Sequence, residues 1–156
     1  MATFQLDDTD RKILSLLVND ARKPYLEIAR ECGISGAAIH QRVKKLEEAG
    51  VITGSRLLVK PSTVGFEVCA YVCVSLSETS KYRDVIEALK KVPEVVECNF
   101  ITGKYALLLK VYCKDNDHFI NVLIHTIQNI PYITNTETMI SLETAFERQV
   151  CVKDAL

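Results

Sequence analysis

Residues 24–50 read PYLEIARECGISGAAIHQRVKKLEEAG and predict two short helices joined by a tight turn. Pro24 suits the first turn of a helix, and Gly33 can take the backbone conformation that a tight turn requires. Ser35 is a good N-cap for a second helix, and Gly50 is well placed to end it. A short, capped helix on a small scaffold is a common way for a protein to enter the DNA major groove.

The second helix carries a polar face that is suited to DNA. Residues at its start would approach base edges, whereas Arg42, Lys44 and Lys45 would meet phosphates. Two other interpretations remain open, because the face could simply be solvated, and Arg42 could bridge groups within the domain. Gly36 and Ala37 have almost no side chain, which favours readout of DNA shape. The candidate DNA-contacting residues are Ser35, Ala37, Ala38, His40, Gln41, Arg42, Lys44 and Lys45.

Helical periodicity also predicts a helix before residues 24–50, and the three helices would share a small core. Asp7 opens that helix, and Asp10 three residues later resembles a capping box with Asp in place of Glu. After Gly50, the strand-like residues 51–59 predict a wing or arm that leads into a linker at 60–65. The residues expected to be buried in the three helices are Ile13, Leu14, Leu17, Leu26, Ile28, Ala29, Ile39, Val43 and Leu46.

The rest of the chain contains an internal repeat of strand, helix and strand. A Val-Pro or Ile-Pro pair ends each helix before an extended run. Two such units in tandem indicate a ferredoxin-like βαββαβ sandwich, so the fold class is α+β, with an N-terminal winged helix-turn-helix before the sandwich. The expected elements are strand 67–76, helix 80–91, strand 94–102, strand 104–113, helix 116–129 and strand 132–142.

Two of these strands, 67–76 and 104–113, are apolar on both faces. Such strands are usually buried on both sides, but two helices can cover only one face of the sheet. Large bare apolar patches are rare on monomers, so a partner subunit is the economical cover, with the N-terminal domain as the alternative. The residues expected at this dimer interface are Cys69, Tyr71, Cys73, Tyr105, Leu107 and Leu109.

Composition narrows the class of protein further. The 156 residues carry a formal net charge of −1, but residues 1–60 hold ten Lys/Arg against eight Asp/Glu, so a local basic face fits the helix pair. The six cysteines form no CxxC pair, so neither disulfides nor a zinc site is expected. Without a secretory signal or membrane-length apolar run, the chain is expected to be cytoplasmic. Catalytic and cofactor motifs are missing, so neither enzyme activity nor a cofactor is expected.

Residues along nearly the whole length form a pattern shared with one known family. They are Leu6-Asp7, Asp10, Ile13-Leu14, Arg22, Ile28-Ala29, Gly33-Ile34-Ser35, Arg42-Val43, Leu46-Glu47, Gly50-Val51-Ile52, Gly54, Pro61, Gly65, Thr102-Gly103 and Thr136-x-Thr138. With this pattern the chain resembles the Lrp/AsnC family, the leucine-responsive or feast/famine transcription regulators. The N-terminal half of the pattern is highly specific in combination, and the C-terminal half agrees in topology.

The resemblance implies a winged helix-turn-helix domain (1–52), a strand or hinge linker (53–66) and an effector-sensing, oligomerising ferredoxin-like domain (67–156). It implies a double-stranded DNA partner, homodimers that assemble into octamers or other higher forms, and an amino-acid effector bound between subunits near the Gly103 loop. The implied effector residues are Gly103, Lys104, Tyr105, Ala106, Ile133, Asn135, Thr136 and Thr138.

Two positions depart from the family pattern. The family usually has an Asp where this chain has Ala106, and that Asp helps to hold the effector's amino group. An aromatic residue often follows the linker glycine, where this chain has Ser55.

The helix pair and the resemblance together imply a sequence-specific transcription regulator, modulated by a small metabolite. Two alternatives remain: an architectural, weakly specific DNA-binding oligomer without an effector, and a small-molecule-binding or catalytic domain whose helices mediate only protein contacts.

Overall fold

The computed structural model describes residues 4–152 and divides into two compact units. The first unit contains the residues up to Leu57 together with those from Phe146 onward, and the second is Leu58–Ala145. In this division, the residues from Phe146 onward group with the helical unit. None of the helices within residues 4–152 is both long and apolar enough to span a bilayer.

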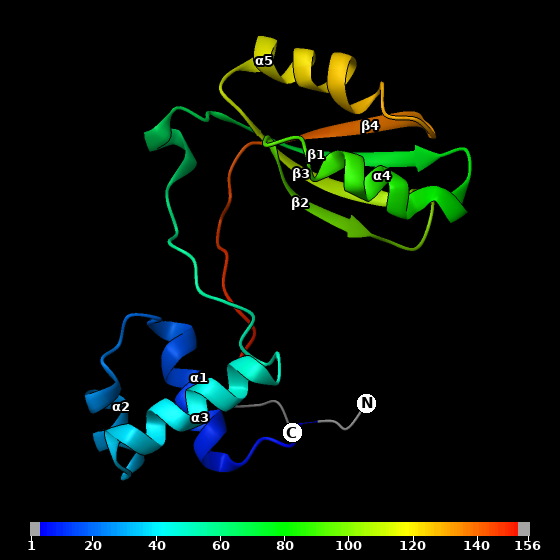
Figure 1. Ribbon diagram of the computed structural model, residues 1–156. Helices are drawn as coiled ribbons and strands as arrows, with labels where there is room; N and C mark the ends of the chain where they lie inside the picture. Colours follow the sequence, from blue (N-terminus) through cyan, green and yellow to red (C-terminus); the bar gives the residue numbers. More distant parts are fainter. Residues whose placement is uncertain (1–3, 153–156) are drawn as a thin grey trace. The chain divides into compact units, whose positions relative to one another are not determined.

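Three helices form the first unit: α1 (Asp8–Asn19), α2 (Tyr25–Cys32) and α3 (Gly36–Glu48) (Figure 1). The expected capping box is confirmed, since the Asp7 carboxylate accepts from the Asp10 backbone N–H at 2.7 Å and the Asp10 carboxylate accepts from the Asp7 N–H at 3.3 Å. Gly33 takes the left-handed conformation (φ 69°) that reverses the chain between α2 and α3. These local features set where each helix starts and ends.

The core of the first unit follows the expected stripes, with one exception. Ile13, Ile28 and Ile39 are fully buried where the three helices meet. Leu26 was expected in this core, but 68% of its surface is exposed. The reason is helix geometry: Ile28 and Ala29 direct one side of α2 inward, and Leu26 lies on another side.

The expected strand-like wing at residues 51–59 is not formed within this chain. No strand is assigned to residues 51–67, and the only regular element there is the short 3-10 helix η1 (Pro61–Val64). Leu57 and Leu58 are 70% and 80% exposed. A strand needs a hydrogen-bonding neighbour, and among the described residues no strand pairs with residues 51–59.

The second unit is the expected ferredoxin-like sandwich. Its strands are β1 (Val68–Leu76), β2 (Val95–Phe100), β3 (Leu107–Cys113) and β4 (Ile133–Ser141), in the antiparallel order β2-β3-β1-β4 (Figure 1). The helical segments are η2 (Thr79–Lys81), which leads into α4 (Tyr82–Leu89), and α5 (Asn116–Asn121), which continues as the π-helix η3 (Val122–Ile127). The expected helix 116–129 is thus an α-helix only in its first part.

Strand register divides the sheet into two different faces. Val72 of β1 lies between Leu109 of β3 and Thr138 of β4, and this face packs against α4, α5 and η3. Tyr71, one residue earlier, lies between Lys110 and Met139 on the opposite face, because side chains alternate along a strand. No helix of the second unit packs on that opposite face, which is called the open face below.

Candidate nucleic-acid interface and effector site

The exposed side of α3 carries a continuous polar stripe. Successive helical residues are about 100° apart, so Ala37, Gln41, Lys44 and Glu48 fall along one line, opposite the buried side of the helix. His40 and Lys45 flank this line, and all six residues are exposed. We call these six residues the α3 stripe. Five of them belong to the set expected to contact DNA.

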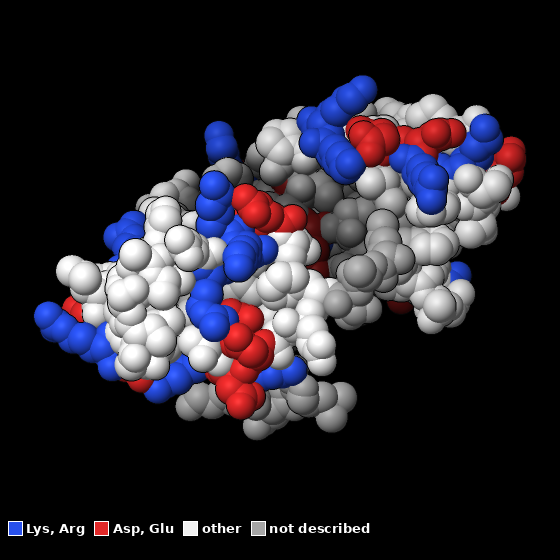
Figure 2. Space-filling model, turned by 60° about the horizontal axis from the view of Figure 1, so that its bottom comes forward, with Lys and Arg blue, Asp and Glu red and all other residues white. Residues whose placement is uncertain are grey.

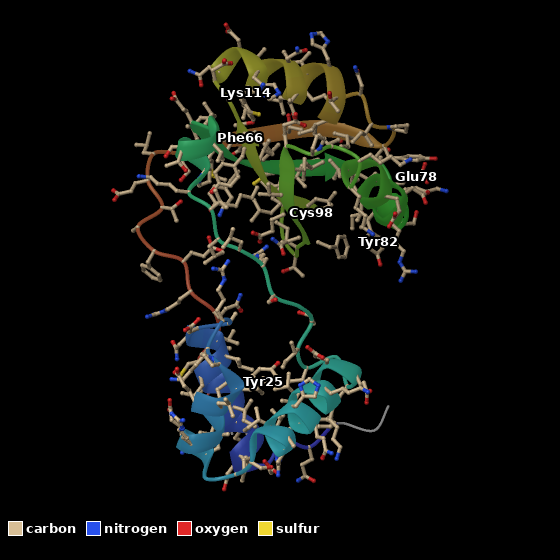
Figure 3. All side chains as sticks on the ribbon, turned by 60° about the vertical axis from the view of Figure 1, so that its left-hand side comes forward. Tyr25, Phe66, Glu78, Tyr82, Cys98 and Lys114 are labelled. Atoms are coloured by element: carbon tan, nitrogen blue, oxygen red, sulfur yellow. The ribbon has the colours of Figure 1, made fainter. Side chains whose placement is uncertain are left out.

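The α3 stripe is fixed at its start by local contacts. The Ser35 hydroxyl accepts from the Ala38 N–H at 3.2 Å, which caps the helix as expected. The ring of Tyr25, labelled in Figure 3, lies 5.9 Å from the ring of His40 and ties the first turn of α2 to α3. Ser35 therefore defines the helix start, while Ala37 and His40 project from its first two turns.

Charge on the first unit is mixed rather than uniformly basic. Figure 2 shows its Lys and Arg side chains interspersed with acidic ones. The Lys44 ammonium lies 3.9 Å from the Glu48 carboxylate, and both side chains are largely exposed. An exposed pair of this kind contributes little free energy, so Lys44 remains available to a stronger anion such as phosphate.

Arg42 does not belong to the α3 stripe, because its side chain is half-buried and engaged within the first unit. Its guanidinium Nη1 is 2.7 Å from Asp7 Oδ2 and 2.7 Å from Asp10 Oδ1, so it joins α3 to the N-terminus of α1. The Asp10 N–H, followed by the Arg42 guanidinium, holds the pKa of Asp7 below its ordinary value. Asp7 and then Asp10 raise the pKa of Arg42. Of the two interpretations of Arg42, the bridge within the domain is the one observed.

Ala38 is also set apart from the α3 stripe. It is half-buried and lines a surface hollow beside the Arg42 bridge. The eight expected DNA-contacting residues therefore divide into five that belong to the α3 stripe and three that do not. Of those three, Ser35 caps the helix, Arg42 bridges to α1, and Ala38 lines a hollow that Gln41 and Lys45 of the stripe also border.

The Gly103 loop lies at one end of the sheet. Gly103 has φ 112°, a conformation that L side chains rarely adopt, so the turn depends on glycine. Ala106 anchors the loop, because its N–H donates to Val74 O at 2.9 Å and its carbonyl accepts from the Ile101 N–H at 2.9 Å. The Ala106 side chain packs against the core of the sandwich.

Glu137 reaches this loop, and the sequence analysis did not single it out. Its carboxylate accepts from the Tyr105 hydroxyl and lies 3.4 Å from the Lys104 ammonium. Tyr105, and then Lys104, keep the pKa of Glu137 below its ordinary value. Glu137 lies between the two threonines of the family pattern, and no local feature of the sequence places it near the Gly103 loop.

The expected effector residues lie on both faces of the sheet. Thr136 and Thr138 pair with Val74 and Val72 and lie on the helix-covered face. The Thr136 hydroxyl accepts from the Gln128 side chain at 2.8 Å. Asn135 alternates with these threonines and lies on the open face with Glu137, while Ile133 packs against the core. Only Lys104 and Tyr105 of the expected set contact the Glu137 carboxylate.

The expected dimer interface is divided in the same way. Tyr71, Cys69 and Cys73 lie on the open face, as the sequence suggested. Leu107 and Leu109 are fully buried beneath the helices, so their assignment to a dimer interface is not retained. Both faces of β3 are apolar, and the sequence pattern alone does not say which one the helices cover.

A helix-turn-helix unit with an exposed recognition-type helix, joined to an α+β sandwich with a polar loop site, defines a DNA-binding transcription regulator with a ligand-binding domain. Family models bear this out: residues 6–53 match the winged helix-turn-helix DNA-binding model, and residues 69–151 match the Lrp/AsnC ligand binding domain model. The chain belongs to the Lrp/AsnC family of transcription regulators.

Individual relatives agree with this assignment. The regulatory protein AsnC of Escherichia coli K12 is 37% identical over 150 residues, which cover 96% of this chain and 99% of the relative. The structure of E. coli AsnC superposes with a TM-score of 0.87 at 36% identity, covering 95% of this chain and 99% of that one. A transcriptional regulator of Neisseria meningitidis in complex with L-Met gives a TM-score of 0.85 at 26% identity, covering 92% and 94%.

Proposed function

We propose that this regulator recognises duplex DNA through the α3 stripe, which lies in the major groove. The observation that carries the proposal is that Ala37, Gln41 and Lys44 are exposed along one line of a capped helix, opposite the fully buried Ile39. His40 is exposed beside that line. Gln41 and His40 can form hydrogen bonds with base edges, and Lys44 can meet phosphate.

The salt dependence of binding by the unmodified protein tests this proposal. A preferred duplex is first selected from random DNA, and its dissociation constant is then measured at increasing salt concentration. Six or more phosphate contacts would lower affinity roughly a thousandfold or more between 50 and 200 mM salt. Failure to bind any duplex, or binding that does not change with salt, would contradict the proposal.

One observation favours an architectural role as a second candidate. Gly36 and Ala37 occupy the helix start, where base contacts are made, and neither side chain can donate or accept a hydrogen bond. The ratio of affinities for selected and random duplexes separates the two functions. A specific regulator gives a ratio of roughly 10³ or more. An architectural protein gives a ratio near one.

Arg42 is proposed to position α3 without contacting DNA. We expect Arg42→Gln to lower both thermal stability and DNA affinity, because α3 loses its bridge to α1, while the slope of log K against log salt stays at the wild-type value. Lys45→Gln serves as the matched comparison, because loss of a phosphate contact reduces that slope by about 0.9. A reduced slope for Arg42→Gln would show that Arg42 contacts phosphate after all.

The bridge from Arg42 to Asp7 makes the free energy of unfolding depend on pH. Because the pKa of Asp7 is lowered in the folded protein, the bridge contributes stability above the unfolded-state carboxyl pKa of about 3.9 and loses it as pH falls through the lower folded value. The stability difference between wild type and Arg42→Gln should therefore be constant near neutrality and disappear in strong acid. Denaturant unfolding measured across that pH range checks the expectation.

The open face of the sheet is proposed as the dimer interface, and further association to octamers would build on that dimer. Cys73 is buried and Cys69, Tyr71 and Leu108 are half-buried, while Met139 is 49% exposed beside Tyr71. This mixture of apolar side chains is suited to the centre of an interface between copies.

We propose that the Gly103 loop binds an α-amino acid and that Glu137 provides the carboxylate for its ammonium group. The proposal rests on Glu137 lying at the loop, where Ala106 leaves the family's usual Asp missing. In the free protein, the Lys104 ammonium group pairs with the Glu137 carboxylate. The effector's ammonium would replace it, which leaves Lys104 free for the effector's own carboxylate.

The effect of Glu137→Gln on amino-acid binding tests this role. Amino acids are screened by thermal shift, and the best one is measured by calorimetry. Affinity should fall about ten- to a hundredfold, because a hydrogen bond to a charged group is worth roughly 1.5–3 kcal/mol. Glu143→Gln, an exposed carboxylate beyond β4, is the control and should change nothing. If no amino acid binds the unmodified protein, or if Glu137→Gln binds equally well, Glu137 does not have this role.

A further inference from the structure

Leu26 presents an apolar side chain to solvent in the first turn of α2, beside the start of the recognition helix. It is 68% exposed although its neighbours Ile28 and Ala29 are buried. A Cβ atom placed on Gly36 would lie 3.4 Å from Leu26 Cδ2, so the leucine side chain extends across the turn to the first residue of α3. Ala37, which follows, is exposed. We call Leu26, Gly36 and Ala37 the leucine patch.

The leucine patch adjoins the α3 stripe. Ala37 belongs to both, and His40, one turn further along α3, contacts the ring of Tyr25, the residue before Leu26. The apolar side chain and the polar stripe therefore occupy neighbouring parts of one surface. If α3 lies in the major groove, the leucine patch meets base edges at the N-terminal end of the helix, where such helices read sequence.

Only one apolar group projects from the base edges of the major groove, and it is the C5 methyl of thymine. Leu26 can neither donate nor accept a hydrogen bond, so contact with phosphates or polar base edges would desolvate them without compensation. Contact with a methyl group instead removes apolar surface from water on both partners. A second protein is a poorer match, because a stable protein interface buries about 1,000 Å² or more and this patch is three residues wide.

We infer that Leu26 reads a thymine methyl group in each half-site and is a specificity-determining residue outside the recognition helix. The inference rests on the proposed placement of α3 in the major groove. It adds a base contact where Gly36 and Ala37 offer no polar readout, and it predicts a preference for thymine that the α3 stripe alone does not explain.

The test replaces thymine by deoxyuracil, one position at a time, in a duplex selected for binding. This substitution removes the methyl group and keeps base pairing and backbone charge. At one thymine per half-site, wild-type affinity should fall about fourfold, the order expected for burial of one methyl group. Leu26→Ala should bind the thymine and deoxyuracil duplexes equally, whereas Leu26→Met should keep the preference. Val18→Ala, which changes another exposed apolar residue of the same unit, should retain the wild-type response.

The outcomes separate this inference from the proposed function. In one outcome, binding depends steeply on salt, but wild type and Leu26→Ala respond alike to deoxyuracil at every position. This result would overturn the role of Leu26 and leave α3 as the DNA-binding helix. Equal weakening of Leu26→Ala on both duplexes, with the preference for thymine intact, would mean that Leu26 only braces α3 and would also overturn the inference. Failure to bind DNA at all would remove both. Because Leu26 is exposed, thermal unfolding of Leu26→Ala should match wild type and confirm that the variant is folded.

Discussion

Replacing Lys44 and Lys45 together by glutamate should lower DNA affinity at least about 30-fold. Both lysines are exposed on the α3 stripe, and neither contributes to the core of the first unit. By counterion release, each phosphate contact contributes roughly fivefold to affinity near 0.15 M salt, so loss of two contacts gives the lower bound. Reversed charge adds repulsion from the duplex, and a dimer carries the change twice.

Two measurements make the lysine prediction specific. The slope of log K against log salt should shrink by about two for each bound helix, and affinity should fall alike on selected and random duplexes, because phosphate contacts carry no sequence information. Lys90→Glu with Lys91→Glu applies the same charge change to exposed positions just after α4 of the sheet unit. Equal loss of binding in both double variants would mean that net charge matters and the position of the lysines does not.

Tyr71→Glu should weaken the association free energy of the proposed dimer by about 3 kcal/mol or more, while the chain stays folded. This corresponds to a rise of roughly a hundredfold in the dissociation constant. Tyr71 is half-buried at the centre of the open face, between Lys110 and Met139. A carboxylate buried there by a second copy would be costly, because its lost hydration is not replaced. In a monomer the same side chain would stay in contact with water.

Leu109→Glu is the matched comparison, because Leu109 lies on the same sheet but beneath the helices. This variant should lose the folded sandwich, whereas Tyr71→Glu should lose only association. Sedimentation or light scattering reports the assembly, and circular dichroism reports the fold. A Tyr71→Glu protein with wild-type assembly at micromolar concentration would show that the open face is not the interface.

The helix boundaries of the first unit were predictable from sequence because their causes are local. Asp7 and Asp10 satisfy each other's backbone groups within one helical turn, and Ser35 does the same for the start of α3. Gly33 reverses the chain because of its own backbone freedom. In the second unit, the βαββαβ order followed from alternating apolar residues and proline punctuation for the same reason.

Other features depended on residues that are distant in the chain. Arg42 was assigned to phosphate from its place among basic residues, yet it bonds to Asp7 and Asp10, 35 and 32 positions earlier. Glu137 contacts Lys104 and Tyr105 only because β4 brings it to them. No local pattern contains such pairings, since packing of separate elements creates them.

Sequence by itself determined the class of this protein: three short helices that present one polar stripe, followed by a tandem βαβ sandwich with a glycine turn. Tertiary structure decided which side of each element is used. Alternation in β3 predicts two apolar faces, and only the packing of the helices places Leu109 inside and leaves Tyr71 open. In α2, Leu26 lies on a different side of the helix from Ile28 and Ala29, and packing of α3 against the Ile28 side leaves Leu26 exposed beside Gly36. The physical reason is common to both: periodicity defines the faces of an element, and neighbouring elements determine which face is buried.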